Sequence, residues 1–251
     1  MYLESSILLS LSVSHPIFIP MFVRWPLVVI LQIFTLLFYY LGILAMFCCW
    51  FNDLQIESNE GRITVRVEKT ISNGFKIFLI SEIMIFTSLI WGFIHLGLNI
   101  NIWSLMIFPS RGLVTIFPYG IPLGNSLTLI KSSLPLQASL LWIKTGLKSI
   151  MIISVAQTIA CTGFFIFIQL KEYTTALFTI SDSMYGTNFY CATGLHGLHV
   201  GFALFCLGVV HYLMLADKSY KELHSTLKLC AYYWHLVDIV WIGLQNLFYL
   251  L

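Results

Sequence analysis

Two histidines three residues apart are among the residues best suited to chemistry in an otherwise apolar chain. His196 and His199 would share one face of a helix at this spacing. Such a pair can supply two ligands to a metal ion, although a complete metal site needs further ligands. In the other interpretation, which we favour, each imidazole hydrogen-bonds to a neighbouring helix. Gly194 and Gly197 would let that helix approach closely.

Glu82 is an acid within the apolar run Phe75–Leu98. An ionised carboxylate in hydrocarbon is costly, so such a group is usually protonated or paired. Acids inside a membrane are therefore candidates for function. Two interpretations stay open. Glu82 is either a proton-linked or lipid-contacting carboxyl, or a structural acid that hydrogen-bonds to a neighbouring helix or to Ser81.

His235 and Asp238 are also three residues apart, at a depth that we predict to be similar to that of Glu82. An imidazole and a carboxylate on one helix face can satisfy each other, so we predict a structural pair. The polar residues are then expected in two layers. The outer layer holds His95, His196 and His199, and the inner layer holds Glu82, His235 and Asp238.

The composition indicates a membrane protein with many helical spans. Of 251 residues, 59% are hydrophobic and 10% are charged, whereas an average soluble protein has about 25% charged residues. A net charge of +2 gives no reason to expect nucleic acid as a partner. The six cysteines show no CxxC spacing, which argues against a zinc site or a disulfide framework. The seven histidines are too few and too scattered for a membrane di-iron centre or a pair of haems.

Six runs are predicted to cross a bilayer, which takes about 20 residues, and the weakest of them, Ile121–Ile143, is interrupted by Lys131 and Pro135. These predicted spans are Pro26–Trp50, Phe75–Leu98, Ile121–Ile143, Ser149–Leu170, Asn188–Leu215 and Leu229–Leu250. The run Ser6–Val23 is a possible seventh, interrupted by a histidine and two prolines. We therefore divide the chain into N-terminal membrane segments (1–50), a charged loop on the inner side (51–74) and a five-helix membrane bundle (75–251).

Cations in the loops predict the orientation. If the spans alternate, eight cations fall on one side: Arg62, Arg66, Lys69, Lys144, Lys148, Lys218, Lys221 and Lys228. The other side has Arg24, Arg111 and Lys171. The positive-inside rule puts the first side in the matrix or cytosol. With seven spans the N-terminus is inside and the C-terminus outside. The N-terminus has neither a signal-peptide nor a transit-peptide pattern, so a mitochondrial destination would imply synthesis inside the organelle.

Three ordered motifs resemble those of one known family. They are ISEIMIFTSLIWGFIH at 80–95, KEYTTALFTISDSMYGTNFYCATGLHGLHV at 171–200 and AYYWHLVDIVW at 231–241. Together they resemble subunit III of cytochrome c oxidase, in the haem–copper oxidase subunit III family, over roughly residues 50 to 251. Departures from the family pattern include Leu140 and Leu141 in place of two histidines, Ser183 in place of a glycine, and Lys228 in place of an acid.

The resemblance implies an all-α bundle of about seven spans, in groups of two and five, that form a V-shaped cleft filled with phospholipid. It also implies a non-catalytic core subunit of the respiratory oxidase in the mitochondrial inner membrane. By the same resemblance, haem a and copper belong to the partner subunits I and II, and accessory subunits complete the complex. Cytochrome c would interact with this chain only through the assembled complex. The implied role is to stabilise the catalytic subunit, bind phospholipid and support proton uptake. Three alternatives stay open: a bacterial plasma membrane, the equivalent subunit of a quinol oxidase, and a separate transporter that uses Glu82.

The resemblance also assigns expected roles to individual residues. Glu82 matches the buried carboxyl of the family, and no residue is expected to be catalytic or to bind metal. The residues expected to fix helix packing and loop shape are His95, Glu172, Asp182, His196, His199, His235 and Asp238. The candidates for contact with lipid headgroups are Glu57, Arg62, His224 and Lys228.

Overall fold

The computed structural model describes residues 64–98, 112–216 and 220–249, and residues 32–62 with gaps. It divides into two compact units, Met1–Thr64 and Val65–Leu251. In the first unit the described residues between 32 and 57 are helical, within and just beyond the predicted span Pro26–Trp50. The predicted span Ser6–Val23 lies outside the described residues.

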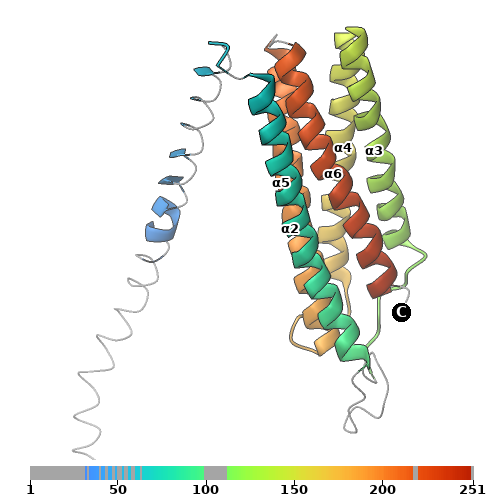
Figure 1. The fold of residues 1–251 in the computed structure, drawn as a ribbon. Coiled ribbons are helices and arrows are strands. Elements are labelled where there is room, and N and C mark those ends of the chain that lie inside the picture. The colour runs from blue at the N-terminus through green and yellow to red at the C-terminus, as the bar shows by residue number, and fades with distance from the viewer. Residues whose placement is uncertain are drawn as a thin grey trace, which may run out of the picture. The chain divides into compact units, whose positions relative to one another are not determined.

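The second unit is a bundle of five long helices (Figure 1). In chain order they are α2 (Val65–Leu98), α3 (Ile121–Thr145), α4 (Lys148–Thr175), α5 (Met184–Leu215) and α6 (Tyr220–Tyr249). The helices lie side by side along most of their lengths, and α6 packs against α2, α3 and α5. The described residues of this unit contain no strand, so the all-α prediction is confirmed for them.

A proline and a glycine mark the two ends of α3, before its short connection to α4. Pro122 lies in the first turn of α3, where its missing N–H costs no hydrogen bond. Gly146 ends α3 with a φ of 75°, a left-handed conformation that glycine adopts without steric cost. Helix α4 begins two residues later, and this short connection makes α3 and α4 an antiparallel pair.

Among the helices of the described residues, α2, α4 and α5 are long and apolar enough to cross a membrane. Helices α3 and α6 carry more polar residues, and several of these are buried against other helices: Asn125, Ser132, Ser139, Asp238 and Gln245. At 1.5 Å per residue, the 25 residues of α3 extend about 37 Å, enough to cross a hydrocarbon core about 30 Å thick. The total of seven spans stays a prediction.

Helix α2 begins ten residues before the predicted span, at Val65 rather than Phe75. The described residues 60–62 form a turn, with Gly61 at a φ of 73°, whereas residues 65–74 of the predicted loop 51–74 are helical. With 34 residues α2 is about 50 Å long, so it can extend beyond the hydrocarbon at its charged end. Charged residues in a sequence indicate a segment outside the lipid, but such a segment can still be helical when the helix extends into water.

The bundle has two apolar cores. The larger one joins α3, α4, α5 and α6 around Trp234, Trp241 and Leu136, all at most 1% exposed. The second is aromatic and joins α2, α5 and α6, with Phe93, Phe189 and Phe248 in its centre. Large apolar side chains also remain exposed on the bundle surface, for example Ile77, Met84 and Trp91 on α2. Such surface suits contact with lipid tails or with another membrane subunit.

Candidate functional site

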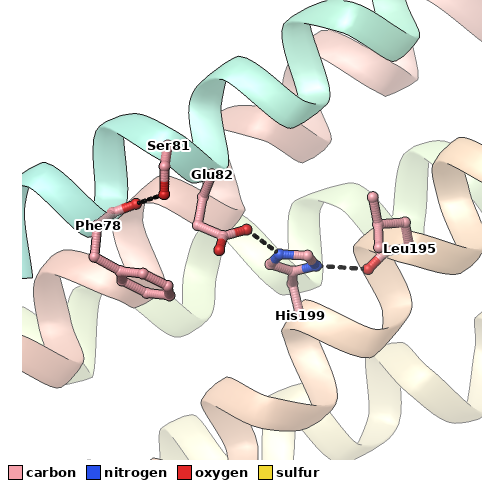
Figure 2. Close-up of polar contacts among 5 residues, drawn as sticks. All are labelled: Phe78, Ser81, Glu82, Leu195 and His199. Atoms are coloured by element: carbon pink, nitrogen blue, oxygen red, sulfur yellow. Dashed lines mark hydrogen bonds and ion pairs between the residues drawn. The ribbon is translucent and has the colours of Figure 1, made fainter.

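A glutamate and a histidine meet between α2 and α5 (Figure 2). The Oε2 atom of Glu82 lies 2.6 Å from Nε2 of His199, and the two side chains are 13% and 14% exposed. Both residues lie near the centres of their helices, Val65–Leu98 and Met184–Leu215. The contact therefore joins the two helices at mid-length.

The second ring nitrogen of His199 limits the protonation states that this pair can adopt. Nδ1 lies 2.8 Å from the carbonyl oxygen of Leu195, one turn earlier in α5. A carbonyl can only accept, so Nδ1 carries a proton and donates it. The second contact then holds one proton, either on His199 as an imidazolium facing a carboxylate or on Glu82 as a carboxylic acid. In both arrangements the pair has no net charge, which lowers the cost of placing it within the membrane.

Aromatic rings line the pair. The ring of Phe86 meets the His199 imidazole edge-on, with centroids 5.0 Å apart, and Tyr233 of α6 stacks on it at 6.4 Å. The hydroxyl of Ser81 donates to the carbonyl of Phe78 at 2.7 Å, facing away from the carboxylate (Figure 2). Of the two structural partners predicted for Glu82, the neighbouring helix is therefore correct and Ser81 is wrong.

The predicted division into two polar layers is wrong. Glu82 was assigned to the inner layer and His199 to the outer one, yet they are hydrogen-bonded. The error comes from counting depth from Phe75, because α2 begins at Val65 and Glu82 therefore lies at its centre. His95 is exposed near the end of α2, thirteen residues or about 20 Å beyond Glu82. The structure does not bring His95 to His199.

His196 contacts α6 rather than α2. It is 1% exposed, and its Nε2 lies 3.3 Å from the backbone carbonyl of Val237. The rings of Phe165 and Trp241 enclose it, with centroids 6.0 and 4.8 Å from the imidazole. The two histidines thus bind different neighbouring helices, as in the interhelical interpretation. Within the described part of the chain, no group of three or more His, Cys, Asp or Glu is placed to hold a metal ion.

The predicted pair of His235 and Asp238 does not form. The Nε2 atom of His235 lies 3.4 Å from the side-chain oxygen of Gln137 on α3. Asp238 is 6% exposed, and its Oδ1 has no hydrogen-bond partner among the described residues. Two residues at i and i+3 share a helix face, but here a residue of a neighbouring helix is the better partner for the imidazole.

Asp182 shapes the turn that precedes α5. Its Oδ2 accepts from the backbone N–H of Thr179 at 2.6 Å. Ser183 is the N-cap of α5, and its hydroxyl accepts from the N–H of Gly186 at 3.1 Å. A Cβ on Gly186 would lie 2.5 Å from the carbonyl oxygen of Thr179, so only glycine fits there. The serine that departs from the family pattern thus gives α5 a side-chain cap that glycine lacks.

Glu172 joins α4 to α6. It is 5% exposed, and its Oε1 accepts from the hydroxyl of Tyr249, while Oε2 has no partner among the described residues. Further tyrosines make similar links: Tyr173 donates to Thr193 at 2.6 Å, and Tyr185 donates to the carbonyl of Phe248 at 2.6 Å. The sequence interpretation missed these tyrosines. The available signal was that a phenol hydroxyl inside an apolar helix must find an acceptor.

The four lipid-headgroup candidates lie in both units. In the first unit, Glu57 and Arg62 are exposed, and Arg62 forms an ion pair with Glu60 at 2.6 Å. In the second, Lys228 is exposed, with its ammonium 5.8 Å from the ring centre of Tyr232. His224 is partly buried, and its Nδ1 has no partner among the described residues. The cations Arg62 and Lys228 are thus exposed, each within its own unit.

Long apolar helices joined by buried polar contacts define this chain as a helical membrane protein. A family model described as cytochrome c oxidase subunit III matches residues 4–251. The chain belongs to this family, which confirms the resemblance inferred from the three motifs. It is thereby a subunit of an oxidase complex and associates with other subunits of it.

Curated relatives agree with the family match. A protein named cytochrome c oxidase subunit 3 from Prototheca wickerhamii is 33% identical over 204 residues, covering 80% of this chain and 76% of the relative. The protein of the same name from Triticum aestivum is 34% identical with the same coverage. That from Marchantia polymorpha is 33% identical over 221 residues, covering 84% of this chain and 80% of the relative.

Proposed function

We propose that this chain is a core subunit of the terminal respiratory cytochrome c oxidase and holds no redox centre of its own. The family match supports the assignment to the oxidase, and the contact between Glu82 and His199 supports the absence of a redox centre. Both ring nitrogens of His199 are engaged, one by Glu82 and the other by Leu195, so this imidazole has no free nitrogen for a metal. A polar pair used in this way supports the packing of α2 on α5 rather than electron transfer.

In this proposal the redox chemistry belongs to partner subunits. Haem a and copper are held by subunits I and II, and cytochrome c reaches this chain only through the assembled complex. The family match and the names of the relatives support this division. Metal and haem analysis of the chain after its separation from the complex tests it. We expect neither haem nor a stoichiometric metal, and a metal bound at His196 and His199 would refute the proposal.

A second part of the proposal is support of proton uptake. One proton shared between a carboxyl and an imidazole at mid-length of two spanning helices is suited to exchange. The test compares oxidase with and without this chain in vesicles, over successive turnovers. We expect the first turnovers to transfer electrons at a similar rate in both, and proton uptake and lasting activity to fall without the chain. Loss of all electron transfer with the haems intact would contradict this role.

The third part is phospholipid binding. In the first unit, the exposed Arg62 suits the phosphate of a headgroup, and Glu57 suits the ammonium group of a zwitterionic one. In the second unit, the exposed Lys228 suits a phosphate, and His224, one helical turn earlier, can hydrogen-bond to it. Lipid analysis of the purified complex tests this assignment. We expect Arg62→Gln or Lys228→Gln to reduce the bound anionic phospholipid, and Lys171→Gln, predicted on the opposite side, to leave it unchanged. Equal lipid content in all three variants would show that Arg62 and Lys228 do not bind the phospholipid.

We further propose the mitochondrial inner membrane as the location, with the loops that carry most cations in the matrix. Three spanning helices and eukaryotic relatives support this location. With seven spans, the C-terminus would lie in the intermembrane space. Protease digestion of a C-terminal tag in intact mitoplasts tests the orientation. If the tag is protected until the membrane is dissolved, the C-terminus lies in the matrix and the proposed orientation is wrong.

A further inference from the structure

Two cysteine side chains meet between α5 and α6. Cys206 of α5 and Cys230 of α6 are free thiols, both partly exposed. The two side chains lie close enough to interact with each other. Two thiols in contact across neighbouring helices differ from a single buried cysteine, because one oxidation step can join them covalently.

The alignment of α5 and α6 supports this contact independently. Near the middle of α5, Nε2 of His196 reaches the carbonyl of Val237 at 3.3 Å. About two turns further on, the ring of Phe202 packs on Tyr233 with centroids 5.5 Å apart. Because the helices run antiparallel, one more turn along α5 and one turn back along α6 lead to Cys206 and Cys230. The two thiols therefore lie at the same level of the same helix pair.

We propose that Cys206 and Cys230 form a dithiol site that a hydroperoxide oxidises to a disulfide, which joins α5 to α6. One thiol, as its thiolate, attacks a peroxide oxygen, and the O–O bond breaks to give a sulfenic acid and an alcohol. The second thiol then attacks the sulfenic sulfur and releases water as the S–S bond forms. Overall, two thiols and one hydroperoxide give one disulfide, one alcohol and one water.

The position of this site relates it to the Glu82–His199 pair. Cys206 lies seven residues beyond His199 on α5, about 10 Å along the helix. Tyr233, one turn from Cys230 on α6, stacks on the His199 ring. A covalent bond at Cys206 and Cys230 would fix the spacing of α5 and α6 next to the rings that enclose the pair.

Thiol mapping in the intact oxidase complex tests the proposal. Membranes are treated with tert-butyl hydroperoxide, remaining thiols are alkylated, and peptides are analysed by mass spectrometry. We expect a cross-linked peptide pair that contains Cys206 and Cys230 and has lost two hydrogens, with alkylation of both cysteines reduced several-fold. Cys206→Ser or Cys230→Ser should abolish the cross-link. The matched control Cys191→Ser, in an exposed position of α5 about 22 Å away, should retain it.

A second measurement on the unmodified chain keeps the test valid if a variant does not assemble. Phenylarsine oxide bridges two neighbouring thiols, so we expect it to protect Cys206 and Cys230 together from alkylation. Addition of a dithiol should reverse this protection, whereas a monothiol should not. Independent alkylation of the two cysteines in the presence of the arsenical would overturn the proposal. A disulfide from either cysteine to Cys191 would overturn it as well.

Discussion

Replacing Glu82 by glutamine separates the packing role of the Glu82–His199 pair from its proton. The amide of a glutamine can donate to Nε2 of His199, as a protonated glutamate would, while Nδ1 still donates to Leu195. The contact between α2 and α5 is then kept, but the proton can no longer move between the two side chains. Because the replacement keeps both shape and hydrogen bond, we expect a stability change within about 1 kcal/mol.

Glu82→Ala should cost more stability than Glu82→Gln. It removes the carboxyl and leaves Nε2 of His199 with no partner at a site where the imidazole is 14% exposed. An unpartnered buried polar group costs about 1 to 3 kcal/mol, which is roughly a 5- to 150-fold change in an equilibrium constant. We therefore expect this variant to loosen the chain in the complex, measured as dissociation of the chain in a detergent titration.

The assay combines that titration with activity of the reconstituted complex. We expect Glu82→Gln to assemble with normal haem content and to show a modest fall in proton pumping or in the lifetime of activity. Equal loss of the subunit in the glutamine and alanine variants would contradict the hydrogen-bond reasoning. Loss of all electron transfer in fully assembled Glu82→Gln oxidase would show that the redox role has been misplaced.

Substitutions at three further residues test the turn before α5 and the link between α4 and α6. Gly186→Ala places a Cβ 2.5 Å from the carbonyl of Thr179, so we expect a loss of about 1 to 3 kcal/mol in thermal unfolding of the complex. Ser183→Ala removes the cap of α5 and should cost about 1 kcal/mol, whereas Ser183→Gly should cost only a few tenths, measured in the same way. Tyr249→Phe leaves Glu172 without its described partner and should cost about 1 to 3 kcal/mol, measured by detergent dissociation.

Matched controls make these three expectations specific. Gly163→Ala lies on α4, where no atom is within 4 Å of the added Cβ, so it should be neutral or slightly stabilising. Tyr212→Phe changes an exposed tyrosine of α5 and should have little effect. The turn geometry is contradicted if Gly186→Ala is as stable as Gly163→Ala. The buried link is contradicted if the two tyrosine variants behave alike.

The helices themselves could be predicted largely from apolar runs. The predicted spans Ser149–Leu170 and Asn188–Leu215 lie inside α4 and α5, because a long uninterrupted apolar run has few alternatives to a helix. The start of α2 is not predicted by its sequence, because mixed charges are typical of a loop, whereas here they continue the helix. That one boundary shifted the estimated depth of Glu82 and hid its contact with His199.

Partners between helices could be predicted only in part. A buried histidine must find a partner, so interhelical hydrogen bonds at His196 and His199 followed from residue type alone. Which atom serves as the partner depends on helix rotation and alignment, and the sequence of one helix does not specify these. His235 illustrates this, because the nearby acid Asp238 was expected to bind it, yet Gln137 of α3 is its partner.

Native mass spectrometry of the purified oxidase tests most directly whether this chain is a subunit without its own redox centre. The predicted result is a complex in which the chain is present together with haem- and copper-bearing partners. After partial dissociation, the chain should appear at its own mass plus phospholipid, with neither haem nor metal. A chain that never co-purifies with a haem-bearing partner, or one that retains a stoichiometric metal, would contradict this assignment.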